Sequence, residues 1–214
     1  MRRKPFVMVL SGPSGAGKST FVAGLLQTFT DLRFSVSATT RPRRPHEVDG
    51  RDYHFLAEEE FEKRVGAGAF LEHAEVHGAR YGTLEAEVSN TLRQGLSILL
   101  DVDVQGGVNV KHRLPDAVLV FILPPSLQVL EQRLRQRGTE AEETIRRRLQ
   151  RAPEEIRHLS DYDYVVVNDT VAETREALVA IYRAESLRRE RLQDAGGGTD
   201  VVAAWLRAES PSGR

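Results

Sequence analysis

Four short runs of consecutive apolar residues divide the chain, and each has the length of a β-strand. They occupy residues 6–10, 98–104, 118–123 and 164–167. The runs are apolar throughout instead of alternating with polar residues, which is typical of strands covered on both faces. This pattern therefore predicts a parallel sheet.

Segments with the apolar spacing of amphipathic helices accompany these runs. We expect helices over residues 20–29, 84–94, 127–136 and 171–192. Strands that alternate with helices indicate an α/β fold. The chain is thus predicted to have a core in which helices flank the parallel sheet.

The stretch from about residue 34 to 96 departs from this alternation. Three β-like pieces, SVSATT, DYHFL and AFLEHAEV, surround one helical segment, EEEFEKRV. We interpret residues 35–96 as an inserted α+β subdomain and assign the core to residues 1–34 and 97–190.

Two other segments stand apart from this core. The highly charged stretch GTEAEETIRRRLQR begins at Gly138, and we predict a second, smaller insert over residues 138–152. Residues 191–214 are expected to form a separate C-terminal tail, because GGG at 196–198 has the composition of a linker.

The composition narrows the class of protein. With 214 residues, 40% hydrophobic and 29% charged, the chain has an ordinary globular composition. Its formal net charge of −1 argues against a chain whose main work is non-specific binding to nucleic acid or acidic membranes. The chain has no cysteine, which excludes disulfides and thiolate metal sites.

The basic N-terminus leads into an apolar run too short for a signal core, so we expect a soluble, cytoplasmic protein.

A glycine-rich motif follows the first apolar run. GPSGAGKS, residues 12–19, matches G-x-x-x-x-G-K-[ST], with a predicted strand before it and a helix after it. In that setting backbone N–H groups surround a phosphate, Lys18 reaches the β- and γ-phosphates, and the Ser19 hydroxyl binds Mg²⁺. The motif predicts a nucleoside triphosphate site. Its residues are Gly12, Pro13, Ser14, Gly15, Ala16, Gly17, Lys18, Ser19 and Thr20.

A P-loop leaves GTPases, ATP-driven motors and small-molecule kinases open. The apolar run in SILLDVDVQGG carries Asp101 and Asp103, of which one could face the metal and the other a substrate. A GTPase should show an N-K-x-D motif, which the sequence lacks, and a motor usually needs a longer chain. These considerations favour a kinase.

A cluster of arginines lies downstream of the P-loop, in SVSATTRPRR at residues 35–44. A kinase that acts on a nucleotide must hold a second anion in line with the γ-phosphoryl group, and the guanidinium fork pairs with phosphate oxygens. Arg41 and Arg44, with the hydroxyl of Tyr53, could form that pocket. The alternative is a solvated basic loop.

The second charged insert suggests a lid. Arg133 and Arg137 are four residues apart and share a helical face, Gly138 follows, and Arg146–Arg148 come next. Phosphoryl transfer needs positive charge and exclusion of water, which a mobile arginine-bearing lid supplies. Solvated salt-bridge surfaces are the alternative for such a segment.

Together these motifs resemble one family. GPSGAGKST, FSVSATTR, VDGRDYHF, FLEHAEVHGARYGT, LLDVDVQG, FILPPS, RLRQRGTE and VVVND occur in this order over roughly residues 5–185 and are similar to guanylate kinase. The resemblance implies a P-loop kinase core that binds ATP, an inserted GMP-binding subdomain and a lid. The implied reaction is ATP + GMP → ADP + GDP with Mg²⁺ and no covalent phospho-enzyme.

The resemblance also implies a role for individual residues. In that family the positions of Ser37, Glu72, Thr83 and Asp103 read guanine. A carboxylate at position 72 would accept hydrogen bonds from guanine N1–H and the 2-amino group, and adenine would leave it unpaired. Arg41, Arg44, Tyr53 and Tyr81 fall on the positions that bind the GMP phosphate, and Asn168 lies near the adenine-contacting segment. The implied catalytic residues are Lys18, Arg41, Arg44, Arg133, Arg137 and Arg148.

The arginine loop departs from the family pattern. The family usually has R-x-P-R, whereas this chain has Arg41-Pro42-Arg43-Arg44, with proline one position earlier, and His46 stands where glycine is common. Proline fixes φ near −65°, so the shift leaves open whether Arg43 or Arg44 grips the phosphate.

The sequence leaves two other interpretations of its function open. One is a related P-loop kinase for AMP or for a ribose phosphate, against which Glu72 and Asp103 argue. The other is a non-catalytic guanylate-kinase-like module, which typically has a degraded P-loop, whereas Lys18 and Ser19 are intact here. We expect ATP and GMP as partners and neither nucleic acid nor membrane, while the oligomeric state cannot be read from the sequence.

Overall fold

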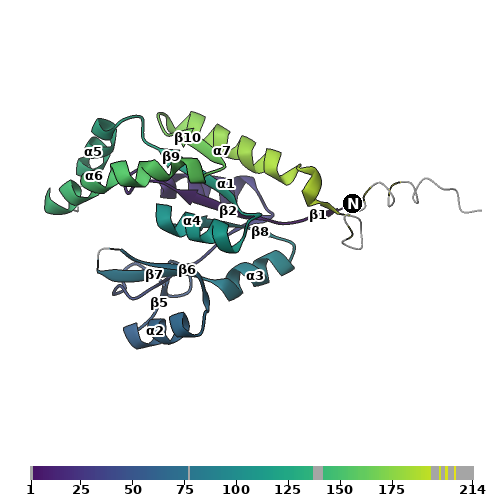
Figure 1. Cartoon of the computed structure of the whole chain (residues 1–214), viewed down its shortest axis with the longest axis horizontal. Helices are drawn as coiled ribbons and strands as arrows, with labels where there is room; N and C mark the ends of the chain where they lie inside the picture. Colours follow the sequence, from purple (N-terminus) through teal and green to yellow (C-terminus); the bar gives the residue numbers. More distant parts are fainter. Residues whose placement is uncertain are drawn as a thin grey trace, which may run out of the picture.

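A parallel sheet forms the centre of the molecule (Figure 1), whose computed structural model describes residues 2–76, 78–136, 142–193, 198, 201 and 205. All neighbouring strands in it are parallel. The predicted α/β core is therefore confirmed. In spatial order its strands are β10 (Tyr164–Val167), β9 (Val118–Leu123), β2 (Val7–Ser11), β8 (Ser97–Asp101) and β3 (Leu32–Phe34).

Both faces of this sheet are covered by helices, which explains the unbroken apolar runs. Met8 and Leu10 of β2 pack toward α1 (Lys18–Thr28) and α7 (Val171–Ser186). Val7 and Val9 point the other way, toward α3 (Glu85–Arg93) and α4 (Val104–Arg113). The two cores thus share the central strand, with alternate residues on either side.

A smaller mixed sheet lies below the core in Figure 1, on the side of α4. Its spatial order is β5 (His54–Phe55), β4 (Ala38–Thr39), β7 (Ala79–Leu84) and β6 (Phe70–Val76). Helix α2 (Glu58–Gly66) covers it by stacking Phe61 on Phe70, with ring centroids 4.5 Å apart. The segment that broke the helix–strand rhythm therefore forms a packed layer of its own.

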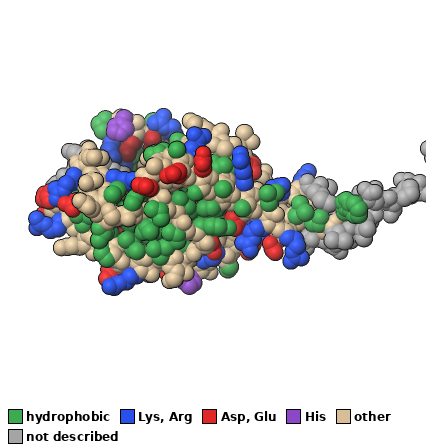
Figure 2. Space-filling model, turned by 90° about the horizontal axis from the view of Figure 1, so that it is seen from above, with side chains coloured by type: hydrophobic (Ala, Val, Ile, Leu, Met, Phe, Trp, Pro, Cys, Tyr) green, Lys and Arg blue, Asp and Glu red, His purple; other side chains and the backbone are tan. Residues whose placement is uncertain are grey.

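Two helices carry the charged segment downstream. Leu130 and Leu134 of α5 (Leu127–Gln136) pack against Ile145 of α6 (Glu142–Arg157). Helix α6 continues five residues beyond the predicted end of the lid, and residues 138–141 of that prediction lie outside the described residues. Short 3₁₀ helices η1 (His158–Asp161) and η2 (Arg189–Arg191) follow α6 and α7. The upper face with α5, α6 and α7, seen in Figure 2, shows apolar side chains gathered among charged ones.

Some boundaries differ from the sequence prediction. The run predicted as a strand over residues 98–104 ends at Asp101, because the Asp103 carboxylate caps the unpredicted helix α4 by accepting a hydrogen bond from Gly106 N (2.6 Å). Helix α7 ends at Ser186 instead of residue 192. The chain then returns to its start, where β11 (Leu192–Gln193) pairs antiparallel with β1 (Arg2–Arg3). Within the described residues, no helix has the length and apolarity that crossing a membrane requires.

Candidate active site

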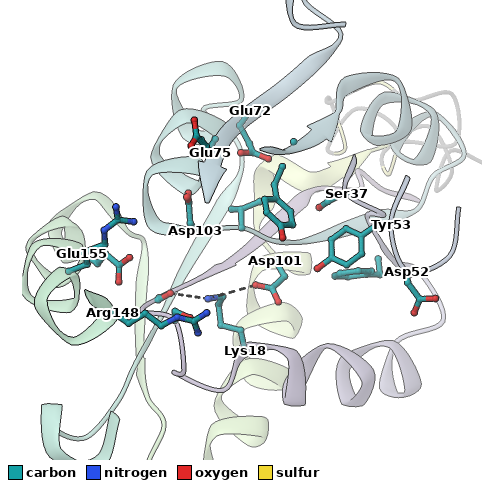
Figure 3. A pocket seen from close by; sticks show the side chains of 18 residues that line it. Lys18, Ser37, Asp52, Tyr53, Glu72, Glu75, Asp101, Asp103, Arg148 and Glu155 are labelled. Atoms are coloured by element: carbon teal, nitrogen blue, oxygen red, sulfur yellow. Dashed lines mark hydrogen bonds and ion pairs between the residues drawn. The ribbon is translucent and has the colours of Figure 1, made fainter. Parts of the chain in front are cut away.

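A cavity of about 380 Å³ opens between the two sheets, at the carboxyl ends of the parallel strands. Ligand sites of open α/β sheets usually lie at this edge. We call the part around Gly12, Ser14 and Lys18 the P-loop end and the part around Glu72 and Asp103 the carboxylate end (Figure 3). The polar lining consists of Ser14, Lys18, Ser37, Asp52, Tyr53, Glu72, Glu75, Tyr81, Asp101, Asp103, Arg148, Arg151 and Glu155.

The P-loop end is built from backbone. Gly12, Gly15 and Gly17 have φ of +145°, +95° and +93°, in the region that favours glycine. At Gly12 a Cβ would lie 2.3 Å from the Ile122 carbonyl oxygen, so the loop packs directly on β9. Helix α1 starts at Lys18, which places its N-terminal N–H groups at the cavity. The arrangement suits a phosphate chain.

Lys18 crosses the loop from the first turn of α1. Its ammonium nitrogen donates to the Gly12 carbonyl at 2.9 Å and lies 3.9 Å from Asp101 Oδ1 (Figure 3). Burial raises the pKa of Asp101, and the nearby Lys18 charge opposes that rise. One cation and one carboxylate therefore face each other beside the loop.

The carboxylate end brings together groups from both layers. Glu72 lies on β6 and is 7% exposed, and the Thr83 hydroxyl of β7 donates to its Oε1 at 2.6 Å. Burial raises the pKa of Glu72 to about 7; the Thr83 hydrogen bond opposes the rise and the Asp103 charge adds to it. Glu72 can therefore take up a proton far more readily than an exposed glutamate, and the Thr83 hydroxyl bonds only to its Oε1.

Aromatic hydroxyls line the wall between the two ends. The rings of Tyr53 and Tyr81 meet edge to face with centroids 6.0 Å apart. Burial raises the pKa of Tyr53, so its hydroxyl stays protonated at neutral pH. Ser37 lines the same wall. These neutral groups can donate hydrogen bonds to an anion or accept them from a base.

The arginine loop is organised by Glu47, a residue that sequence reasoning missed. Arg41 Nη2 and Nη1 bind its two carboxylate oxygens at 2.7 and 3.1 Å, and the Arg44 backbone N–H donates to Oε2 at 2.8 Å. These bonds lower the pKa of Glu47 to about 2. Arg41 also lies over the Tyr53 ring, 5.3 Å from its centroid. None of the described residues Arg41, Arg43 and Arg44 lines the cavity, and the last two side chains are exposed.

The lid arginines are placed differently from one another. Arg148 lines the cavity and donates to Ser14 Oγ at 2.6 Å, so α6 touches the P-loop. Arg133 instead donates to the Asn168 carbonyl oxygen at 2.8 Å and is not part of the lining among the described residues. Arg137 lies outside the described residues. Of the two described side chains, Arg148 therefore lies at the P-loop and Arg133 does not.

Two more residues named from the sequence lie behind the cavity wall. Asn168 is 4% exposed; its Nδ2 donates to the Ala16 carbonyl at 2.7 Å, and its Oδ1 accepts from Thr174. Through the hydrogen bond to Ala16, Asn168 supports the P-loop backbone. Thr83 is fully buried beside Glu72 and orients that carboxylate.

Helix α6 contributes two lining residues that the sequence analysis did not single out, Arg151 and Glu155. They follow the predicted Arg148 at helical spacing (i, i+3, i+7), and that shared face is the signal that could have pointed to them. Burial raises the pKa of Glu155, and the charge of Lys18 opposes the rise. The cavity thus holds cationic and anionic groups side by side.

The donor atoms are compatible with a hard cation at the P-loop end. Ser19 is exposed at the start of α1, and the Asp101 carboxylate lies 3.9 Å from the ammonium of the neighbouring Lys18. Hydroxyl and carboxylate oxygens suit Mg²⁺, which usually keeps several waters and binds substrate phosphates. The described residues contain no cluster of three or more His, Cys, Asp or Glu side chains able to hold a metal.

Comparison with known proteins gives a consistent match. Residues 3–185 match the family model of guanylate kinase. The guanylate kinase of Symbiobacterium thermophilum is 49% identical over 188 residues, which cover 88% of this chain and 89% of the relative. That of Rhodopseudomonas palustris is 48% identical over 192 residues, covering 89% and 87%. The crystal structure of guanylate kinase from Anaplasma phagocytophilum superposes with a TM-score of 0.72 at 34% identity, covering 87% of this chain and 89% of that one.

Proposed function

This chain belongs to the guanylate kinase family and transfers the γ-phosphoryl group of ATP to GMP, giving ADP and GDP; we propose that it does so in the cavity between the two sheets. One observation carries this proposal. A P-loop with its lysine, the buried Glu72 and the partly buried Asp103 line the same cavity, so the donor phosphates and an acceptor base can be held in one space.

The carboxylate end is proposed to read guanine. Ionised Glu72 accepts from N1–H and the 2-amino group through the oxygen that Thr83 leaves free. Asp103 lies beside it as the cap of α4, and Ser37 lies on the adjoining wall. Adenine offers an acceptor at N1 and no 2-amino group, so it would leave a buried charge unpaired. This difference supports selection of GMP over AMP.

The GMP phosphate is proposed to bind between Tyr53, Tyr81 and Arg41. The two tyrosines line the cavity, and the Arg41 guanidinium stacks on the Tyr53 ring. Arg41 is held by Glu47, so a phosphate must share or replace that pairing. Arg44 reaches the phosphate only if its exposed side chain swings inward. The residues 35–96 that carry these groups are proposed as the GMP-binding subdomain.

At the P-loop end, backbone N–H groups and Lys18 hold the ATP phosphates. Ser19, with Asp101 nearby, would hold Mg²⁺, whose chemistry is to offset the charge of the phosphate oxygens. Arg148, on α6, adds positive charge at the P-loop end. We propose that residues 138–152 act as a lid over the ATP phosphates, together with Arg133 and Arg137. Little covalent work falls to the protein, because positioning and charge neutralisation carry most of the transfer. An adenine contact for Asn168 and a cytoplasmic location stay predictions.

The proposal is tested by ADP formation from ATP and Mg²⁺ with GMP, AMP, CMP, UMP or ribose phosphate as acceptor. We expect turnover with GMP and at most traces with the others. Glu72→Gln should lower kcat/KM for GMP by about 100-fold or more, because the amide offers one donor where guanine needs an acceptor. The KM of Glu72→Gln for ATP should stay within twofold of the wild-type value. The matched variant Glu75→Gln, on the same strand, should likewise keep its KM for ATP within twofold. An unchanged KM for GMP in Glu72→Gln would overturn the base-reading role.

A further inference from the structure

Helix α4 carries two consecutive glycines near its start, and their presence needs an explanation. Gly106 and Gly107 lie in its first turn, where glycine is less favourable than alanine by about 1 kcal/mol. Neither is among the described glycines with positive φ, so the backbone conformation would accept a side chain. The reason for glycine is therefore space.

The space beside Gly106 is taken by the carboxylate end. A Cβ on Gly106 would lie 2.9 Å from Glu72 Oε2, 2.9 Å from Asp103 Oδ1 and 3.3 Å from Val102 Cβ. Contacts below 3.0 Å essentially never occur for real Cβ atoms, so one of these atoms would have to move. Gly107 faces elsewhere, where a Cβ would lie 2.4 Å from the Tyr162 hydroxyl.

The atoms that would move are the ones that matter for the base. Oε1 of Glu72 is held by Thr83, so Oε2 is the oxygen left for a ligand. Asp103 Oδ1 is held by the Gly106 N–H at 2.6 Å. Both oxygens end flexible side chains, so an added Cβ would displace the recognition groups directly, and for Asp103 it would also weaken the cap of α4.

We propose that Gly106 is a specificity-determining residue of this enzyme: the missing side chain is what lets Glu72 of β6 and Asp103 of α4 occupy the base site together. The inference rests on the proposed function and deepens it. It assigns the choice of a guanine-bearing nucleotide to a position that carries no functional group of its own.

The test compares Gly106→Ala with the wild type on GMP and on IMP, which lacks the 2-amino group. We expect kcat/KM for GMP to fall at least about tenfold and the preference for GMP over IMP to shrink, because Glu72 Oε2 is displaced. KM for ATP should stay within about twofold of the wild-type value. The thermal unfolding midpoint should stay close to that of the wild type, because the helix propensity gained by alanine offsets the weakened Asp103 cap. Gly24→Ala is the matched control. Gly24 also lies in a helix, α1, and a Cβ there would make an ordinary 3.5 Å contact with Arg175 Nε.

A second variant separates crowding from other causes. Glu72→Asp withdraws that carboxylate by one methylene, so adding Gly106→Ala to it should cost less kcat/KM for GMP than adding it to the wild type, because only the contact with Asp103 Oδ1 remains crowded. Independent, multiplying losses would contradict the proposal, and so would full GMP preference in Gly106→Ala. Equal rates of the wild type on GMP and IMP would instead overturn base reading by Glu72 itself.

Discussion

At the P-loop end, residues 12–19 form one continuous turn that offers its own backbone, whereas at the carboxylate end Glu72 and Asp103 come from different layers of the molecule. The glycines of the loop fix its shape locally, and Asn168 supports it by a single hydrogen bond to Ala16. The carboxylates meet only when β6 packs on α4. Phosphate binding is thus a local property of the chain, and base reading is a tertiary one.

The two ends also differ in what they do to the fold. The Lys18 ammonium is satisfied by the Gly12 carbonyl and lies near Asp101. Glu72 by contrast is buried beside another carboxylate, and its pKa rises from 4.5 to about 7. A rise of this size corresponds to roughly 3 kcal/mol in favour of the neutral form. The carboxylate end therefore lowers the stability of the folded protein at neutral and higher pH, where the ionised carboxylate is available for recognition.

Loss of the lysine should separate the two ends most strongly. In Lys18→Ala we expect kcat to fall by about 1,000-fold or more, because charge on the transferring phosphoryl group loses its closest protein cation. The Kd for GMP, measured by calorimetry, should change less than about threefold, since the base is held elsewhere. If GMP binding were lost together with turnover, the two ends would not be independent.

Arg148 is expected to give the next largest effect, because it contacts the P-loop from α6. Arg148→Ala should lower kcat by about 100-fold with little change in either KM. Ser14→Ala keeps the guanidinium and removes only its 2.6 Å hydrogen bond, so we expect a loss below about tenfold. Equal losses in steady-state assays of the two variants would mean that Arg148 acts by docking α6 and not by its charge.

What could be predicted from the sequence follows the same division between local and tertiary features. The motif at residues 12–19 and the apolar runs at 118–123 and 164–167 are local signals, and they match the structure. Helix α4 was missed because glycines at 106 and 107 depress helix propensity, and the run VDV looked like a continuing strand. Only the Asp103 cap and the packing of β6 make it a helix.

The arginine loop shows why the remaining site residues could not be derived. SVSATTRPRR suggested a phosphate pocket, yet Arg41 is paired with Glu47 and the side chains of Arg43 and Arg44 are exposed. Which partner an arginine takes depends on distances that no spacing rule gives. Arg151 and Glu155 share a helical face with the predicted Arg148, but their spacing does not by itself tell whether that face meets solvent or a cavity.

The pH dependence of GMP binding should sharpen the contrast. The proposed base reading needs the ionised form of Glu72, so KM for GMP should rise as pH falls below about 7, approaching tenfold per pH unit. KM for ATP should stay flatter between pH 6 and 8. Glu72→Gln is the control for the GMP phosphate, which also titrates near pH 6. A wild-type profile that matched this variant would contradict the assignment.

The raised pKa also fixes the sign of the stability change. Because the folded pKa lies above the ordinary value of 4.5, the stabilising contribution is complete below about pH 4.5 and is lost as pH rises through about 7. The unfolding midpoint of Glu72→Gln should therefore gain on that of the wild type from pH 6 to pH 8. Thermal scans of both proteins across that range measure the difference.

The smallest effect is expected from Arg113, at the far end of α4. Its Nη1 donates to the carbonyl oxygens of Phe70 and Leu71 at 2.5 and 3.3 Å, and Nη2 lies 3.3 Å from Glu85 Oε2. These carbonyls belong to the strand residues that directly precede Glu72. Arg113 therefore ties the strand that carries one base-reading carboxylate to the helix that is capped by the other.

In Arg113→Ala we expect KM for GMP to rise about three- to fivefold, since roughly 1 kcal/mol of hydrogen bonding to β6 is lost at a half-exposed site. Glu85→Ala removes the ion pair and keeps both carbonyl bonds, so it should change KM for GMP less than about twofold. KM for ATP serves as the internal reference in the same assays. A parallel rise of KM for ATP would show general loosening of the fold, whereas a rise confined to GMP would show that the carboxylate end depends on how α4 holds β6.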